Sequence, residues 1–400
     1  MRNDMITQPT AAATHADDLL AAYQHDDFFL ASPKGTLLCR GRRATVSLQD
    51  GSAPFGEQLR AAVDTSDDPA TQPAIAVGAL PFDTYRPAEL VVPHTVHRGG
   101  PLPARSDEPD QGIGIPQWNT ETIPDAAAHQ HAVAQAVQQI RSGAIDKVVL
   151  ARVIRLTTAQ PLGGRVRRIL RNLAARDPRC YTFAAALPST AGTRTLVGAS
   201  PELLLSRSGT TVMTNPLAGS AARSPDPAED RRRAEALLAS AKDRREHTVV
   251  VEAVVENLRP LLRDLRVPSH PSLVCTATMW HLSTVITGQV ADADIAAVDL
   301  ARALHPTPAV CGTPTDRARA TIGELEPFDR GFYAGTLGWC DATGDGEWVV
   351  TIRCAEVGDH ELRLFAGGGI VGDSDPAAEV AETSAKLRTL LRAMGVHQEL

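Results

Sequence analysis

The chain has 400 residues, of which 43% are hydrophobic and 22% are charged, a composition typical of a globular protein with a substantial core. Its net charge of −7 argues against a general role in binding nucleic acid or an anionic membrane surface. No apolar run approaches the ~20 residues of a membrane helix, and the N-terminus shows no signal-peptide pattern. The six cysteines have neither C-x-x-C nor zinc-site spacing, so we expect reduced thiols and a cytoplasmic protein.

The N-terminal third gives weak signals for secondary structure. Two segments, 28–33 and 36–46, are candidate strands. Residues 92–127 are rich in proline, glycine and charge, a pattern that indicates a long loop.

From residue 128 onward the periodicity is clear. Val133, Val137 and Ile140 recur at helical spacing and Gly143 ends that helix. Asp226-Pro227 begins another helix as N-cap and first residue. Further helices are predicted over 243–262 and 376–394, and strands over 147–156, 181–187, 195–198, 203–206, 211–214, 348–354 and 361–366. Strands and helices are mixed without a βαβ alternation, which predicts an α+β fold of large, mostly antiparallel β-sheets flanked by helices.

Two predicted helices each carry a pair of carboxylates. Asp243 with Glu246, and Glu379 with Glu382, are three positions apart, so each pair lies on one helix face. If the helices meet, four acids converge and a divalent cation is needed to offset their repulsion. This favours a magnesium-dependent enzyme with an anionic substrate. Stabilisation of a helix N-terminus, or an ion pair between Glu382 and Lys386, is the structural alternative.

Two residues are candidates for proton transfer. Lys147 begins an apolar strand face, where desolvation favours a neutral amine that acts as a base. Glu202 precedes three leucines, and a carboxyl beside an apolar run tends to keep its proton and act as an acid. Considered alone, each residue is more simply interpreted as solvated, Lys147 through its long stem and Glu202 as part of a turn.

A glycine run joins the last predicted strand to the last helix. Gly367, Gly369 and Gly372 match G-x-G-x-x-G, but no second parallel strand and no ribose-binding acid follow, which excludes a dinucleotide site. The run fits backbone amides that approach an anion, or a tight turn. Arg353 has the guanidinium geometry that suits a carboxylate. Tyr333 and His281, considered alone, are more simply interpreted as packed residues.

Together and in this order, these segments resemble the chorismate-utilising enzymes. The matching segments are 146–152, 198–202, 216–220, 245–247, 281–283, 305–312, the glycine run from 367, Glu379, 382–383 and 386–387. Each motif is modest and the ordered set is specific. The resemblance implies the fold of anthranilate synthase component I, in which residues 1–127 form a weakly matched N-terminal part and residues 128–395 form the chorismate-binding catalytic region.

The resemblance also implies an activity. A lysine at position 147 is typical of members that add water, Ala218 replaces the nucleophilic lysine of aminodeoxychorismate synthases, and the Leu-Leu-Glu-Ser element of anthranilate synthases is absent. Residues 305–312 are similar to isochorismate synthases. We therefore expect reversible conversion of chorismate to isochorismate, feeding siderophore or menaquinone synthesis. The alternatives are a salicylate synthase, an anthranilate synthase-type subunit and a non-catalytic chorismate-binding protein.

The same resemblance assigns roles to the candidate residues. Lys147 is the general base and Glu202 the general acid. Mg²⁺ is held by Glu246 and Glu382, with Asp243 and Glu379 orienting its ligands. The residues expected to bind substrate are Gly219, His281, His305, Tyr333, Arg353, Gly367, Gly369 and Lys386. We expect a monomer that needs no glutaminase subunit.

Overall fold

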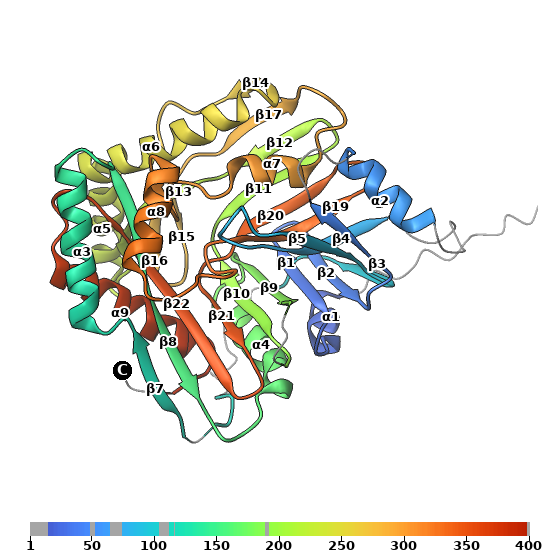
Figure 1. Ribbon diagram of the computed structural model, residues 1–400, viewed down its shortest axis with the longest axis horizontal. Helices are drawn as coiled ribbons and strands as arrows, with labels where there is room; N and C mark the ends of the chain where they lie inside the picture. The colour runs from blue at the N-terminus through green and yellow to red at the C-terminus, as the bar shows by residue number, and fades with distance from the viewer. Residues whose placement is uncertain are drawn as a thin grey trace, which may run out of the picture.

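Two large antiparallel β-sheets and one small sheet, with helices on their outer faces, build the protein (Figure 1). The structure is a computed structural model, and it describes residues 15–48, 53–64, 74–103, 112–115, 117–188 and 192–397. Strands and helices are mixed as the sequence predicts, and the α+β expectation is confirmed.

The first large sheet carries the strand that begins with Lys147. Its order is β18 (Gly312–Thr313), β8 (Lys147–Thr157), β22 (Glu361–Ile370), β21 (Cys354–Val357), β10 (Thr195–Ser200), β9 (Tyr181–Ala186), β1 (Phe28–Ser32), β2 (Gly35–Arg40) and β6 (Thr95–Gly99), and β7 (Asn119–Ile123) also pairs with β8. The longest pairing joins β8 and β22, which run antiparallel from Glu361 opposite Thr157 to Ile370 opposite Val148. This pairing brings the glycine run beside the start of β8.

The second large sheet has the order β14 (Leu262–Arg266), β17 (Ile286–Val290), β12 (Thr211–Thr214), β11 (Leu203–Ser208), β20 (Gly346–Val350), β19 (Thr336–Asp341), β4 (Ile75–Leu80), β5 (Ala88–Val92) and β3 (Ala44–Leu48). The small sheet has the order β13 (Leu217–Ala222), β16 (Met279–Ser283) and β15 (Ser272–Cys275).

The helices of the described residues cover the outer faces of these sheets. They are α1 (Ala16–Ala22), α2 (Phe55–Asp64), α3 (Ala126–Arg141), α4 (Val166–Arg176), α5 (Pro227–Ala239), α6 (Ala241–Leu258), α7 (Ala297–Leu304), α8 (Thr315–Leu325), α9 (Pro376–Ala393) and a 3₁₀ turn at Gly163–Arg165. None of them is both long and apolar enough to cross a membrane.

Two hydrophobic clusters explain why the central strands are apolar on both faces. Phe28 and Leu30 of β1 belong to a cluster formed by both large sheets together with α2, α3 and α7. Phe29 and Ala31, the alternating residues, belong to a second cluster formed with α1, α4 and α9. A strand with both faces covered reads as a continuous apolar run instead of alternating. The N-terminal strands contribute to both large sheets, β1, β2 and β6 to the first and β3, β4 and β5 to the second. The expected domain boundary at residue 127 stays a prediction.

Three predicted elements differ from the structure. The expected strand 348–354 is interrupted, because Arg353 has a left-handed φ of 51° between β20 and β21. The segment 36–46 forms two strands, β2 and β3, that lie in different sheets. The expected loop 92–127 contains β6 and β7, which lie at the periphery of the first sheet where exposed polar strands are tolerated.

Candidate active site

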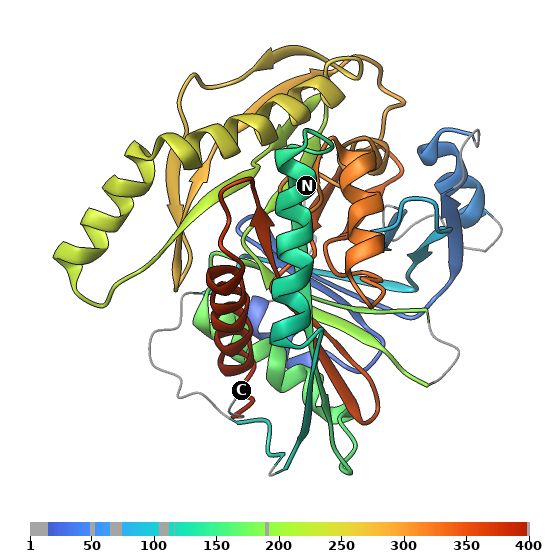
Figure 2. The same cartoon turned by 60° about the vertical axis from the view of Figure 1, so that its left-hand side comes forward.

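A cavity of about 300 Å³ lies where β8, β22, the small sheet, α6 and α9 meet. Figure 2 shows α6 in yellow-green and α9 in dark red on the same side of the molecule. The cavity is lined by nearly all residues singled out from the sequence: Lys147, Glu202, Gly219, Asp243, Glu246, His281, Tyr333, Arg353, Gly367, Gly369, Glu379, Glu382 and Lys386. Residues from positions 147 to 386 therefore share one concave and strongly polar space.

Helix caps fix the two acidic helices that face the cavity. Ser240 caps α6 by accepting a hydrogen bond from the amide of Asp243 at 3.2 Å. Asp375 caps α9 by accepting from the amide of Ala378 at 2.8 Å, and Pro376 occupies the first turn. These caps satisfy helical amides that would otherwise lack partners. The carboxylates of Glu246 and Glu379 are thus presented from firmly anchored helix starts.

Three carboxylates approach the same stretch of the glycine run. A Cβ added to Gly368 would lie 2.8 Å from Glu379 Oε2 and 4.0 Å from Glu382 Oε1. A Cβ added to Gly369 would lie 3.3 Å from Glu246 Oε1. The absence of side chains at these two glycines leaves the space in which the carboxylates converge.

Lysines pair with two of these carboxylates. Lys147 Nζ lies 2.6 Å from Glu246 Oε1, and Lys386 Nζ lies 2.6 Å from Glu382 Oε1. Burial acts to raise the pKa of Glu246, but the charge and hydrogen bond of Lys147 outweigh it and the net pKa is lowered. Within the described part of the chain, no three histidine, cysteine or acidic side chains already form a metal-binding cluster.

Glu379 has one carboxylate oxygen with a hydrogen-bond partner and, in the described part of the chain, one without. Its Oε1 accepts a hydrogen bond from the Ser374 hydroxyl at 2.9 Å, whereas its buried Oε2 has no partner among the described residues. Burial, opposed by that hydrogen bond, raises the pKa of Glu379. A buried carboxylate oxygen without a partner is rare, and a cation between Glu246, Glu379 and Glu382 would satisfy it. The donor set, all carboxylate oxygen, is the kind that magnesium prefers.

Glu202 lies on the opposite wall in the turn between β10 and β11. Its side chain is buried, and its only hydrogen bond in the described structure is a long one of 3.4 Å from the amide of Leu217. Burial raises the pKa of Glu202 to about 7, against the lowering influence of that bond and of Lys147. A carboxyl that keeps its proton near neutral pH is suited to general acid catalysis.

Arg353 and Tyr333 form the third side of the cavity. The Tyr333 ring stacks on Phe365 with centroids 4.9 Å apart, and its hydroxyl would lie 2.9 Å from a Cβ on Gly367. Arg353 is largely buried, which lowers its pKa, and no described carboxylate forms an ion pair with it. A buried guanidinium without a counter-ion is costly, so this wall is suited to a ligand carboxylate.

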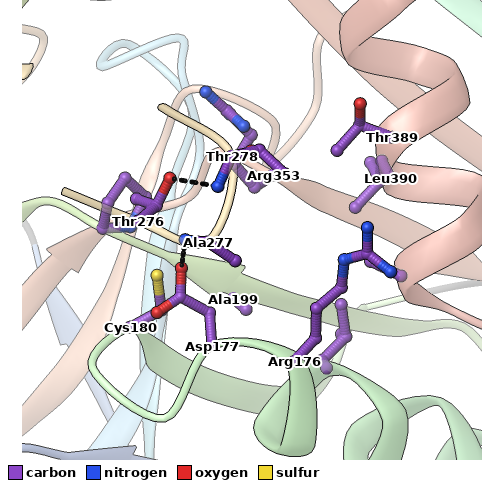
Figure 3. A pocket seen from close by; sticks show the side chains of 13 residues that line it. Arg176, Asp177, Cys180, Ala199, Thr276, Ala277, Thr278, Arg353, Thr389 and Leu390 are labelled. Atoms are coloured by element: carbon purple, nitrogen blue, oxygen red, sulfur yellow. Dashed lines mark hydrogen bonds between the residues drawn. The ribbon is translucent and has the colours of Figure 1, made fainter. Parts of the chain in front are cut away.

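A second cavity of about 60 Å³ lies behind Arg353 (Figure 3). It shares Pro201, Arg353 and Leu390 with the large cavity. Asp177 on its wall accepts a hydrogen bond from the amide of Ala277 at 2.7 Å, so that carboxylate already has a partner. Arg353 therefore has no ion-pair partner among the described residues on this side either.

His305, which the resemblance places among the substrate-binding residues, lies apart from the other expected site residues. It does not line the cavity, and its Nε2 lies 3.0 Å from the backbone oxygen of Pro81 while its ring packs against the edge of Phe82. Burial lowers the pKa of His305 to about 4, so it is a neutral, buried residue that joins the 305–312 segment to the N-terminal part. Cys311 is fully buried, with Sγ 3.6 Å from the backbone oxygen of Thr315, and also lies outside the cavity wall.

Other wall residues had no role assigned from the sequence, although Pro201, Ala309 and Val310 lie in matching segments. Pro201, Ala309, Val310, Ile352 and Phe365 line the cavity as apolar surface, and nothing in an apolar side chain distinguishes a cavity wall from a core. Ser220 also lines the cavity and contacts His281. It stands inside a matching motif, but no role was assigned to it.

With this geometry established, comparison with known proteins defines the family. The chain matches the family model described as chorismate binding enzyme over residues 102–395, and it belongs to that family. It is 49% identical to the isochorismate synthase DhbC of Bacillus subtilis over 402 aligned residues, covering 98% of this chain and 99% of the relative.

Solved structures support the same assignment. The chain resembles a crystal structure of a putative 2,3-dihydroxybenzoate-specific isochorismate synthase, DhbC of Bacillus anthracis, with a TM-score of 0.88 at 43% identity, covering 96% of this chain and 100% of the other. It shares its fold with anthranilate synthase component I of Streptococcus pneumoniae, with a TM-score of 0.70 at 20% identity, covering 98% and 95% of the two chains. The family expected from the sequence motifs is confirmed.

Proposed function

We propose that the protein is an isochorismate synthase, an isomerase that converts chorismate to isochorismate reversibly and depends on Mg²⁺. The observation that carries the proposal is the cavity itself, in which Lys147 and Glu202 face the space between a carboxylate cluster and the unpaired Arg353. The isochorismate synthase of Bacillus subtilis, 49% identical over nearly the whole chain, supports it. The product would feed synthesis of a siderophore based on 2,3-dihydroxybenzoate, or of menaquinone.

The reaction adds water at C2 of the ring and expels the C4 hydroxyl, so it needs one base and one acid. Lys147 takes a proton from the attacking water. Glu202 gives a proton to the departing hydroxyl, and its pKa of about 7 means that a large fraction of the protein carries that proton at neutral pH. Each such group typically contributes ~10²–10⁴-fold to the rate.

The two substrate carboxylates bind different groups of the same cavity. The enolpyruvyl carboxylate meets the Arg353 guanidinium, the Tyr333 hydroxyl and the glycine-run backbone near Gly367 and Gly369. Tyr333 keeps its proton, because burial raises its pKa, so it donates to an anion. The ring carboxylate lies near the acid cluster and Lys386, which also donates a hydrogen bond to the Gly367 carbonyl at 2.9 Å.

Glu246 and Glu382 would hold the magnesium ion, with Asp243 and Glu379 orienting its ligands. When bound, the ion would bind the ring carboxylate and supply the positive charge that Glu246 and Glu382 receive from lysines in this structure. Lys147 can accept a proton only as a neutral amine, and in this structure its Nζ lies 2.6 Å from Glu246 Oε1. We infer that this contact loosens when the water and substrate take their places in the cavity.

The proposal is tested by chromatography of the products formed from chorismate and magnesium, with and without a chelator. Isochorismate that disappears with the chelator is the expected result. Salicylate with pyruvate would move the assignment to a salicylate synthase, and anthranilate formed from added ammonia would move it to an anthranilate synthase-type subunit. No turnover in any condition would leave a chorismate-binding protein.

A further inference from the structure

One ring nitrogen of His281 has a hydrogen-bond partner, and the other has none among the described residues. Its Nδ1 lies 2.7 Å from the hydroxyl oxygen of Ser220. Its Nε2 is buried, and no group in the described part of the chain bonds to it. Because His281 lines the large cavity, the unpaired nitrogen is a place for a ligand atom, and Ser220 holds the opposite side of the ring.

A β-bulge places Ser220 beside His281. In the β13–β16 pairing Ala218 lies opposite Leu282, but Ser220 lies opposite His281, so Gly219 is one extra residue in β13. Gly219 has a left-handed φ of 78°, and a Cβ there would lie 3.1 Å from Asp243 Cβ. Without the bulge, Ser220 would face Trp280. Residues directly opposite in an antiparallel pair share a face, so the bulge is what brings the hydroxyl to the imidazole.

The tautomer of His281 depends on the partners of its two ring nitrogens, and Ser220 is the described partner of Nδ1. Burial, together with the charges of Arg353 and Lys386, lowers the pKa of His281 to about 3, so the ring is neutral. A neutral imidazole has one N–H and one acceptor nitrogen, and the partner of one nitrogen decides the state of the other. A serine hydroxyl that donates to Nδ1 leaves the N–H on Nε2, facing the cavity.

The proposed substrate has oxygen atoms that can accept a hydrogen bond from the Nε2–H group. The substrate of the proposed function is a dianion whose carboxylates, hydroxyl and ether offer oxygen acceptors to the wall. An acceptor nitrogen at Nε2 would repel those oxygens, whereas an Nε2–H group donates to them. A serine hydroxyl can donate or accept, and Ser220 has no other side-chain partner within the described structure, so it is able to donate to Nδ1 when a substrate oxygen accepts from Nε2–H.

We propose that Ser220 is a positioning residue that holds His281 in the tautomer with Nε2–H directed at the substrate. This inference rests on the proposed function for the identity of the ligand and concerns a residue with no assigned role. Ser220 acts only through His281, so its contribution must disappear when His281 is replaced.

The first test is nitrogen NMR of the full chain labelled with [¹⁵N]histidine, with magnesium and chorismate present. The His281 signals are identified by their loss in His281→Gln. Wild type and Ser220→Thr, which keeps the hydroxyl, are expected to show a protonated Nε2 and a bare Nδ1, and Ser220→Ala a mixture of tautomers. A protonated Nδ1 in the wild-type complex would overturn the inference.

The second test is a double-mutant cycle on kcat/KM. We expect Ser220→Ala to lower kcat/KM by roughly ten-fold, the usual loss when a hydrogen bond to a buried polar group is removed, and Ser220→Thr to restore most of it. In the His281→Gln background the same change is expected to have almost no effect. Ser272→Ala is the matched control, because it removes an exposed hydroxyl from the neighbouring strand β15.

An equal loss in both backgrounds, or no rescue by threonine, would mean a structural role and would refute the inference. The proposed function fails separately. If wild-type protein gives no product while NMR still shows the Nε2–H tautomer with ligand bound, the enzyme assignment is wrong and the role of Ser220 stands.

Discussion

Glu202 provides a prediction in which activity and stability change in opposite directions. Its carboxyl has a pKa of about 7 in the folded protein, raised by burial from the ordinary value of 4.5. Between those two pH values the folded chain holds a proton that the unfolded chain has released. Stability therefore falls as pH rises through this window. One pH unit of pKa displacement corresponds to about 1.4 kcal/mol, so the total loss is about 3 kcal/mol by pH 8.

Glu202→Gln removes this loss because glutamine has a similar shape and no charge, and its carbonyl oxygen can still accept from the Leu217 amide. At pH 8 we expect the variant to be more stable to urea than wild type by up to about 3 kcal/mol, and at pH 4.5 the difference is expected to vanish. At the same time turnover of chorismate falls by ~10²–10⁴-fold, because the variant has no acidic proton to give.

The measurements are urea unfolding at both pH values and chromatography of the product. Glu235→Gln is the control, since Glu235 is exposed on α5, and we expect no pH-dependent change in stability from it. The reasoning is refuted if Glu202→Gln gains no stability at pH 8 relative to pH 4.5, or if it keeps wild-type turnover.

Three further predictions address other parts of the site. Lys147→Ala removes the base, and we expect turnover to fall by ~10²–10⁴-fold while circular dichroism and the melting profile stay folded; an unfolded variant would not support the assigned role. Gly367→Ala places a Cβ 2.9 Å from the Tyr333 hydroxyl and 3.2 Å from Val149 Cγ1. We expect urea unfolding to show a loss of ~1–3 kcal/mol from this overpacking, and the KM for chorismate to rise because the displaced groups line the cavity. Gly164→Ala, which meets no atom within 4 Å, is the control and should change neither. Glu326→Gln breaks a fully buried ion pair with Arg330 at 2.6 Å, and urea unfolding should show a loss of ~3–5 kcal/mol; a loss below ~1 kcal/mol would contradict the buried-pair argument.

The catalytic segments were predictable because they combine charge with local periodicity. Glu246 and Glu382 lie on helix faces that the i,i+3 spacing defines, and Lys147 begins a strand whose apolar run is unambiguous. The ordered set of motifs gave the family, which the comparisons confirm. The roles assigned to these residues remain predictions, although the structure brings them to one cavity.

Other features depend on pairing between distant segments, which no local pattern encodes. His305 belongs to a matching motif but turns toward Pro81, a partner 224 positions away. The interruption at Arg353 was missed because the five residues before it all have high β-propensity and nothing in their pattern signals one left-handed residue. Ser220 acquires its contact with His281 through a bulge at Gly219, and a bulge shifts the register by one residue without changing the composition of the strand.

The charged side chains that line the cavity indicate which ligand charges it can bind. Lys147 and Lys386 already have carboxylate partners, but Arg353 has no described partner and Glu379 keeps one oxygen unpaired. Burial of the Arg353 guanidinium without a carboxylate partner is unfavourable. The left-handed backbone of Arg353, with φ of 51°, costs a further ~1–3 kcal/mol. Such costs persist where a ligand offsets them. A carboxylate cluster and an arginine without a described carboxylate partner line the same cavity, and this combination fits the proposed binding of a dicarboxylate substrate together with a cation.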